Sequence, residues 1–532
     1  MKKRYSLMAV LLMATAIAKA QDTYMNDRLT ATDDIDGTAR FVGMGGAMGA
    51  LGADLSVISS NPAGMALFRK SDIGMTFGAV VPGKANGWNS NHNRTYGEKL
   101  PRGSFDQMGF VWAANIDGPV LKYVTFSANY QKKANYNLGF YADNLNLNGL
   151  SQMDQVAELV TGDEKGGYDT DYNLAGFAKD WSYVVETNEG SGQYVNTYRG
   201  ERSRYTRHQR GSLQAFDLNF AFNLNDRIYT GLTLGIDNID FLSWSAYEEE
   251  NVDPKTGEYG DYMLYNDRQI EGKGFNVKWG LIARPMEGSP FRLGLAVETP
   301  TWYRIRNSSK FDLPNKENDY RDVYLESSIR TPWRARFSMG STVDNVLAWG
   351  VEYEYANMAK TKAGYPTYSY TDWDGYRSLS QSTADVAMNQ LTKETLKGQH
   401  TVRIGLEAKP TSALALRVGY NFISNRYRSN PRFDQYMLDS RAMDYMTSTD
   451  YMTLGATNIV TFGLGFRHKA FYADLAYKYR MQNGKFYAFD TGFTSEDTQF
   501  SADNPELTGS TISPVDVELN RHQVMLSLGF KF

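Results

Sequence analysis

The sequence contains no cysteine, so neither disulfide bonds nor thiolate metal sites can contribute to this protein. Its histidines are few and scattered, and none shows the H-E-x-x-H spacing of a zinc protease. No G-x-S-x-G segment is present to hold a nucleophilic serine. The five histidines are His92, His208, His400, His468 and His522. These absences predict a protein that is not an enzyme, with no catalytic residue, no metal site and no cofactor.

Long apolar runs are also missing. The run at 7–17 has 11 residues, too few to cross a bilayer as a helix. It follows Lys2, Lys3 and Arg4 and precedes an A-x-A cleavage site, so residues 1–20 are predicted to be a secretory signal peptide cleaved after Ala20. Its loss removes four basic residues including Lys19, which moves the formal net charge from −4 to −8. That balance offers no basic face for nucleic acid.

What the sequence has instead is alternation. The mean hydropathy of −0.49 is typical of a soluble protein, but it averages over apolar and polar residues that alternate along short segments. Met108, Phe110, Trp112 and Ala114 show this period of two clearly. Fourteen such segments recur, at about 72–81, 105–116, 121–131, 212–224, 227–242, 272–283, 290–303, 333–342, 345–357, 400–409, 413–424, 459–468, 471–481 and 520–532.

The connections between these segments fall into two classes that alternate. Tight turns with the sequences IDGP, NLND, PMEGS, TVDN, KPTSA and RHKA join every second pair. The remaining connections are long, at about 82–104, 139–211, 245–271, 304–332, 358–399, 425–458 and 482–519. An even strand number with short turns at one end is typical of a membrane barrel, whereas a sandwich or propeller would not separate the two classes. We therefore predict an all-β protein whose residues 72–532 form a 14-stranded antiparallel transmembrane β-barrel.

The segment 37–70 is rich in glycine and alanine, and between Arg40 and Arg69 its only charged residue is Asp54. It ends in a short helix that Asn61 can cap and Pro62 can begin. A loose leader is one interpretation, but a barrel of this width needs something to fill its lumen. We therefore predict that residues 21–71 form a small helical hatch inside the barrel, with the mature N terminus starting at the periplasmic end.

At this point the sequence resembles a known family. The segment RFVGMGGAMGALGADLSVISSNPAGMA is similar to the hatch of the FadL-type outer-membrane transporters of long-chain fatty acids and hydrophobic compounds, with Asn61, Pro62 and Ala63 at the position of their NPA motif. The segments at 291–304, 331–340, 401–410, 461–479 and 526–532 agree. The resemblance implies a hydrophobic groove in the outer loops and a lateral opening at a kinked third strand. Strand 121–131 lacks glycine, so no gate residues are transferred.

Two groups of residues are candidates for ligand binding. In the loop 139–211, Met153, Val156, Leu159 and Val160 have the spacing of an amphipathic helix, which either forms an outer groove or packs on the barrel rim. Alternation also places ten cations and seven carboxylates in the lumen. They are Lys278, Arg292, Arg334, Arg336, Arg403, Arg417, Arg467, Lys478, Arg480 and Lys531, with Asp217, Asp237, Glu298, Glu352, Glu354, Glu407 and Asp474.

Among these cations, Arg334, Arg336, Arg403 and Arg417 are candidates for holding the acidic head group of a ligand. The alternative is that the lumenal charges only dock the hatch. We expect a monomeric passive transporter that takes up hydrophobic or amphipathic small molecules, similar to long-chain fatty acids, through a hatch-gated barrel. It would be integral to the outer membrane of a Gram-negative bacterium, in contact with its lipids. The terminal strand ending in Phe532 would engage the barrel assembly machinery. The alternatives are a general diffusion porin, a surface hydrolase or an adhesin.

Overall fold

The computed structural model describes residues 21–32, 34–82, 102–116, 118–166, 173–312, 320–344, 346–370, 377–428, 440, 445–489 and 512–532. The predicted signal peptide lies outside the described residues. No helix in the described part of the chain is long and apolar enough to cross a membrane.

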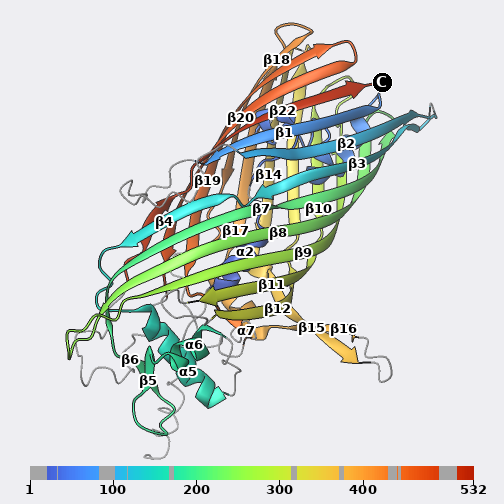
Figure 1. Ribbon diagram of the computed structural model, residues 1–532. Coiled ribbons are helices and arrows are strands. Elements are labelled where there is room, and N and C mark those ends of the chain that lie inside the picture. Colours follow the sequence, from blue (N-terminus) through green and yellow to red (C-terminus); the bar gives the residue numbers. More distant parts are fainter. Residues whose placement is uncertain are drawn as a thin grey trace, which may run out of the picture.

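Fourteen antiparallel strands form a closed barrel, which confirms the prediction from alternation (Figure 1). The first and last strands close it, with pairing from Asp72↔Lys531 to Pro82↔Arg521. The barrel strands are β1 (Asp72–Pro82), β2 (Arg102–Asn115), β3 (Leu121–Asn135), β7 (Arg199–Leu224), β8 (Ile228–Val252), β9 (Tyr262–Ala283), β10 (Arg292–Glu298), β13 (Arg334–Val343), β14 (Leu347–Asn357), β17 (Gly398–Ala408), β18 (Leu414–Ile423), β19 (Tyr451–His468), β20 (Phe471–Tyr487) and β22 (Arg521–Lys531).

The strands are amphipathic in the sense that a membrane requires. Large apolar residues face outward, as Trp112, Phe220 and Leu464 do at about half exposure, while their neighbours along the strand face the lumen and are buried. This outward band is what lipid would cover.

Several strands are longer than the alternation suggested, and β7, β8 and β9 exceed their predicted bounds most. β7, β8 and β9 have 26, 25 and 22 residues, so the end of the predicted loop 139–211 and most of the predicted loop 245–271 are strand. The prediction missed these extensions because the strands rise beyond the apolar band, where both faces can carry polar residues. The segment 290–303 is not one strand either. It breaks at 299–301, where Pro300 has no N–H to donate to a neighbouring strand.

Shorter elements extend the wall and cap the end of the barrel that carries the long loops. β4 (Leu138–Asn144) continues the wall beside β7, and β11 (Trp302–Asp312), β12 (Tyr320–Arg330), β15 (Lys362–Tyr370) and β16 (Arg377–Ala384) continue it beside β9. The other elements are β5 (Val184–Glu186), β6 (Tyr194–Asn196), β21 (Val515–Glu518), α5 (Gln152–Gly166), α6 (Leu174–Asp180), α7 (Val386–Thr395) and η2 (Met358–Lys360).

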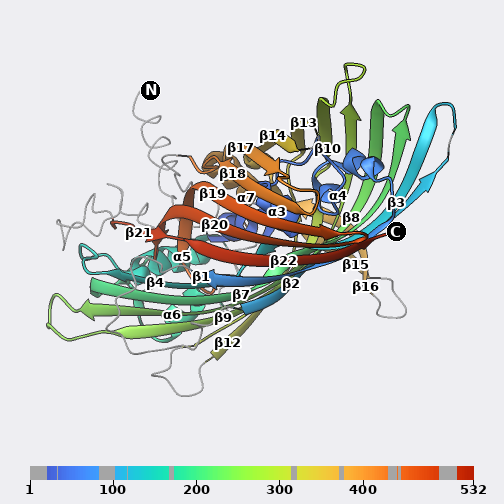
Figure 2. The same ribbon diagram turned by 90° about the horizontal axis from the view of Figure 1, so that it is seen from above.

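The hatch, residues 21–71, is enclosed by the strands in both views (Figures 1 and 2). It contains α2 (Gln21–Thr30), α3 (Ala39–Gly43), α4 (Val57–Ser60) and the 3₁₀ helix η1 (Pro62–Leu67). The expected direction of its N terminus was wrong. Tyr24 of α2 stacks on Tyr427 and Tyr451, with ring centroids 5.3 and 5.0 Å apart, so the described chain starts at the long-loop end of the lumen.

Candidate functional site

The hatch contacts the barrel wall backbone to backbone, through glycines. Gly340, Gly350, Gly405 and Gly419 are cross-strand partners on four consecutive strands, β13, β14, β17 and β18. A Cβ atom at Gly405 would overlap the carbonyl oxygen of Met44, and one at Gly419 would overlap the amide of Gly45. We call these four residues the glycine ladder. At Gly350, Gly405 and Gly419 any larger residue would push the backbone of the hatch off the wall, whereas at Gly340 the hatch atoms nearby belong to the side chain of Leu51.

The predicted Asn61-Pro62-Ala63 motif contacts a different part of the wall, at Gly231 of β8 and Gly280 of β9. Asn61 is buried; its side-chain oxygen accepts the amide of Ala63 at 3.2 Å, and its Nδ2 donates to the carbonyl of Gly49 at 2.9 Å. Asn61 therefore caps η1 and also ties it to the preceding hatch loop. On the wall, a Cβ atom at Gly280 would overlap Asn61 Oδ1, and a Cβ atom at Gly231 would crowd the carbonyl of Pro62.

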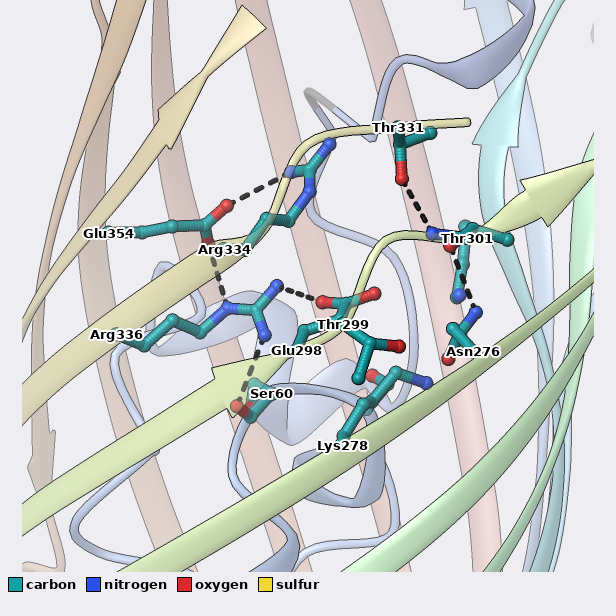
Figure 3. A network of polar contacts seen from close by, with 12 residues as sticks. Ser60, Asn276, Lys278, Glu298, Thr299, Thr301, Thr331, Arg334, Arg336 and Glu354 are labelled. Atoms are coloured by element: carbon teal, nitrogen blue, oxygen red, sulfur yellow. Dashed lines mark hydrogen bonds and ion pairs between the residues drawn. The ribbon is translucent and has the colours of Figure 1, made fainter. Parts of the chain in front are cut away.

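The lumenal arginines chosen from the sequence lie inside the barrel, and all four are paired with carboxylates. Arg334 and Arg336 bind Glu354 at 3.0 and 2.9 Å, and Arg336 also reaches Glu298 at 2.8 Å (Figure 3). The same guanidinium donates to the carbonyl of Ser60 in the hatch at 3.4 Å.

The other two candidates follow the same pattern. Arg403 binds Glu352 and Glu354 at 2.7 and 2.9 Å. Arg417 binds Glu407 and Asp474, both at 2.6 Å, and is buried. The geometry therefore favours hatch docking over head-group binding for these four arginines, whose role in binding stays a prediction.

A second set of cations lies nearer the long-loop end of the lumen, beside α2 of the hatch. A cavity of about 80 Å³ is lined by Arg28 of α2, Arg480 and Arg521 of the wall, and by Leu454 and Leu519. Sequence reasoning missed Arg28, because it belongs to no period-two segment, and Arg521, although it begins a predicted strand.

The arginines of this cavity have fewer acidic partners than the four lumenal arginines described above. Arg521 pairs with Asp34, whereas Arg28 donates to the amide oxygen of Gln209 at 3.3 Å and makes no ion pair among the described residues. Burial, with repulsion from Arg480 and Arg207, lowers the pKa of Arg28 to about 10. The site is thus a cation-rich cavity with an apolar side, the chemistry that a carboxylate on a hydrocarbon tail would match.

The candidate groove residues of α5 are not exposed. Met153, Val156, Leu159 and Val160 are at most 3% exposed. They pack in one large core with α6 and with residues from the long-loop ends of the barrel strands. The structure therefore shows the packing alternative, a folded cap at the long-loop end (Figure 1).

A surface hydrolase would need histidines such as His400 and His522, and both lie on the outer surface of the barrel. His400 and His522 bond through Nδ1 to the hydroxyl groups of Tyr353 and Tyr477, both at 2.7 Å. Neither pair has the carboxylate and nucleophile of a catalytic group.

One seam in the wall is incomplete. β2 and β3 pair from Asn115↔Tyr123 to Gln107↔Gln131, yet β2 extends to Arg102 and β3 to Asn135. Asp106 forms a bulge against β1, and β3 shifts its register near Lys133. Lys132 bridges the seam to Asp106 at 3.1 Å. β3 thus departs from regular pairing although it contains no glycine. Because the strand lacks glycine, the sequence had not supported the kink that the family resemblance implied.

The closed barrel thus contains a docked hatch and a small cation-rich cavity that α2 of the hatch helps to line. No protein-family model matches this chain, and no characterised protein sequence matches it. Its fold, however, is similar to that of a FadL homologue from Pseudomonas aeruginosa, with 13% identity and a TM-score of 0.50 over 94% of this chain and 99% of that one.

Two further solved structures match over the same shares of both chains, a monoaromatic hydrocarbon channel, CymD, and the toluene transporter TodX of P. putida. Both are 10% identical, with TM-scores of 0.48 and 0.47. The resemblance to the FadL-type family that the hatch sequence indicated is thereby confirmed at the level of the fold.

Proposed function

We propose that this protein is a passive outer-membrane transporter that takes up hydrophobic or amphipathic small molecules resembling long-chain fatty acids. The observation that carries the proposal is the docked hatch: it fills the lumen below a cation-rich cavity, so a solute must bind before it passes. A general diffusion porin would need a water-filled lumen. The FadL homologue and the hydrocarbon channels named above support a hydrophobic substrate.

The proposed route avoids the hatch. A ligand enters at the long-loop end, its head group binds at Arg28 and Arg521, and its tail leaves through the seam between β2 and β3. The same cavity is lined by Ala134 to Gly139, where β3 ends, which brings the binding site next to that seam. The hatch then serves as a fixed floor that keeps polar solutes out.

The head-group part is tested by binding. A fluorescent long-chain fatty acid should bind about tenfold more tightly than its methyl ester, because a charge-assisted hydrogen bond contributes about 1.5–3 kcal/mol. Arg28→Met should remove that difference and keep the packing of the side-chain stem. Arg227→Met, at an exposed short turn, is the matched control. Equal affinity of wild type for acid and ester would leave a transporter of neutral hydrophobic compounds.

The route is tested by cross-linking, which the absence of native cysteines makes clean. In an Asp106→Cys/Lys132→Cys variant, a short reagent that joins two thiols should close the seam. Cells expressing the protein should then lose uptake of the fluorescent fatty acid, while each single-cysteine variant treated in the same way keeps it. Full uptake through the joined seam would rule out the lateral route.

A further inference from the structure

On the outer face of the barrel, two like-charged pairs stand directly opposite each other across the strand ladder. Lys273 of β9 faces Arg304 of β11, and Arg330 of β12 faces Lys362 of β15. Like charges in opposed positions are destabilising, because their Cβ atoms are only about 4.5–5.5 Å apart. None of the four cations makes an ion pair with a described residue. We call these four residues the basic row.

The position of the basic row relates it to the membrane. The outward residues one step nearer the short turns than Lys273 and Arg304 are Phe275 and Trp302, which are cross-strand partners, lie level with Arg330 and Lys362, and are 45% and 48% exposed. They form the edge of the lipid-facing band on this flank. Arg330 is the cross-strand partner of Trp302. The basic row therefore stands at the level where lipid head groups begin, on strands that lie side by side in Figure 1.

The next row of outward-facing side chains, one step farther from the short turns, is mostly acidic. It carries Asp240, Glu271 and Glu326 together with Arg306, which pairs with Glu326 at 3.5 Å. These acids therefore lie farther from the bilayer than the basic row, and among the described residues none of them forms an ion pair with it. The charge nearest the bilayer remains uncompensated by the protein.

Beyond the acids lies a shallow groove of about 450 Å³ on the same outward face. Trp244 lies in it, with its ring 5.7 Å from that of Tyr265 and 6.0 Å from that of His208, measured between centroids. Gln269 and Ser308 add polar groups. A groove that combines an aromatic face with amide and hydroxyl groups suits a sugar ring, which presents both C–H faces and hydroxyls.

We propose that this flank binds a phosphorylated glycolipid of the outer leaflet. Its acyl chains would cover the apolar band, its phosphate would sit on the basic row, and its sugars would extend into the groove. An anion at the basic row removes the repulsion between the opposed cations, and guanidinium groups match phosphate oxygens well. The proposal rests on the proposed outer-membrane location but is independent of the transported ligand.

The test compares lipids that differ in one group. Protein in detergent is titrated with lipid A, with the same lipid after removal of its phosphates, and with phosphatidylglycerol, and bound lipid is counted by native mass spectrometry. A basic residue near a charged lipid surface contributes about fivefold, so Lys273→Gln/Arg304→Gln/Arg330→Gln should weaken lipid A binding by about 100-fold. The pair Lys122→Gln/Arg227→Gln, near the short turns, is the control, and should bind as wild type does.

Each outcome decides the proposal. The proposal is supported if the triple variant selectively loses binding of phosphorylated lipid A. It is also supported if Trp244→Ala binds core-containing lipopolysaccharide more weakly while its binding of lipid A is unchanged. Wild-type binding by the triple variant overturns it. An equal loss of phosphatidylglycerol also overturns it, because the row would then attract any anionic lipid. Normal fatty acid uptake by the triple variant keeps this result separate from the transport proposal.

Discussion

Two clusters of arginine occupy the same lumen but are built differently. Around the hatch, the guanidinium groups of Arg334, Arg336, Arg403 and Arg417 meet carboxylates that the wall supplies, as Arg417 does between Glu407 and Asp474. Nearer the long-loop end, Arg28 of α2 meets the amide of Gln209, beside a cavity. A buried cation whose charge is matched by the protein holds structure together, whereas one matched only by neutral groups can accept an anion from outside. Position inside a barrel therefore does not reveal which arginine binds a ligand.

The largest effect should come from separating the hatch from the wall below it. Gly419→Val places a branched side chain where the backbone of Met44 and Gly45 now lies, so the hatch must shift. We expect polar ions to pass, seen as a stable conductance in planar lipid bilayers where wild type shows almost none. Gly103→Val is the control, because nothing lies within 4 Å of a Cβ atom there. A silent Gly419→Val channel would mean that the hatch does not seal the lumen.

The comparison between the clusters is tested more directly by one substitution in each. Arg417→Met leaves the buried Asp474 without an ion pair among the described residues, although Glu407 keeps Arg40 and Lys409, and it should lower the free energy of unfolding by about 3–5 kcal/mol. Arg28→Met strands no charge, so it should change stability little and head-group affinity strongly. Urea unfolding in lipid vesicles measures the first quantity, and fatty acid titration the second. Equal losses of stability would show that the two clusters have the same role.

Much of this architecture could be predicted from the sequence, because lipid imposes a period of two. Alternation located the wall, and its parity placed Arg334 and Arg336 in the lumen. It could not show that both bind Glu354, since that depends on the register between β13 and β14. The cavity lined by Arg28 was missed because its residues are far apart in the sequence and meet only in the folded protein, from α2, the end of β3 and the start of β22.

The glycine ladder illustrates the same limit. Each of its members occupies an ordinary strand position, and glycine in a strand has many explanations. Only the register aligns Gly340, Gly350, Gly405 and Gly419, and only the hatch explains them. By contrast, the cap of η1 could be predicted because a cap and its helix are neighbours in the chain.

The smallest effect concerns that cap and separates its two hydrogen bonds. Asn61→Asp keeps an oxygen for the amide of Ala63 but loses the donor to Gly49, whereas Asn61→Ala loses both. A lost cap costs about 1 kcal/mol, and an unsatisfied buried carbonyl costs about 1–3 kcal/mol. Because Arg292 binds the nearby carbonyl of Leu51 at 2.8 Å, the loop remains held in both variants. We therefore expect an intact barrel with a hatch that protease cuts faster in Asn61→Ala than in Asn61→Asp, measured by limited proteolysis in detergent. Identical cutting of both variants would show that the bond to Gly49, and not the cap, fixes this end of the hatch.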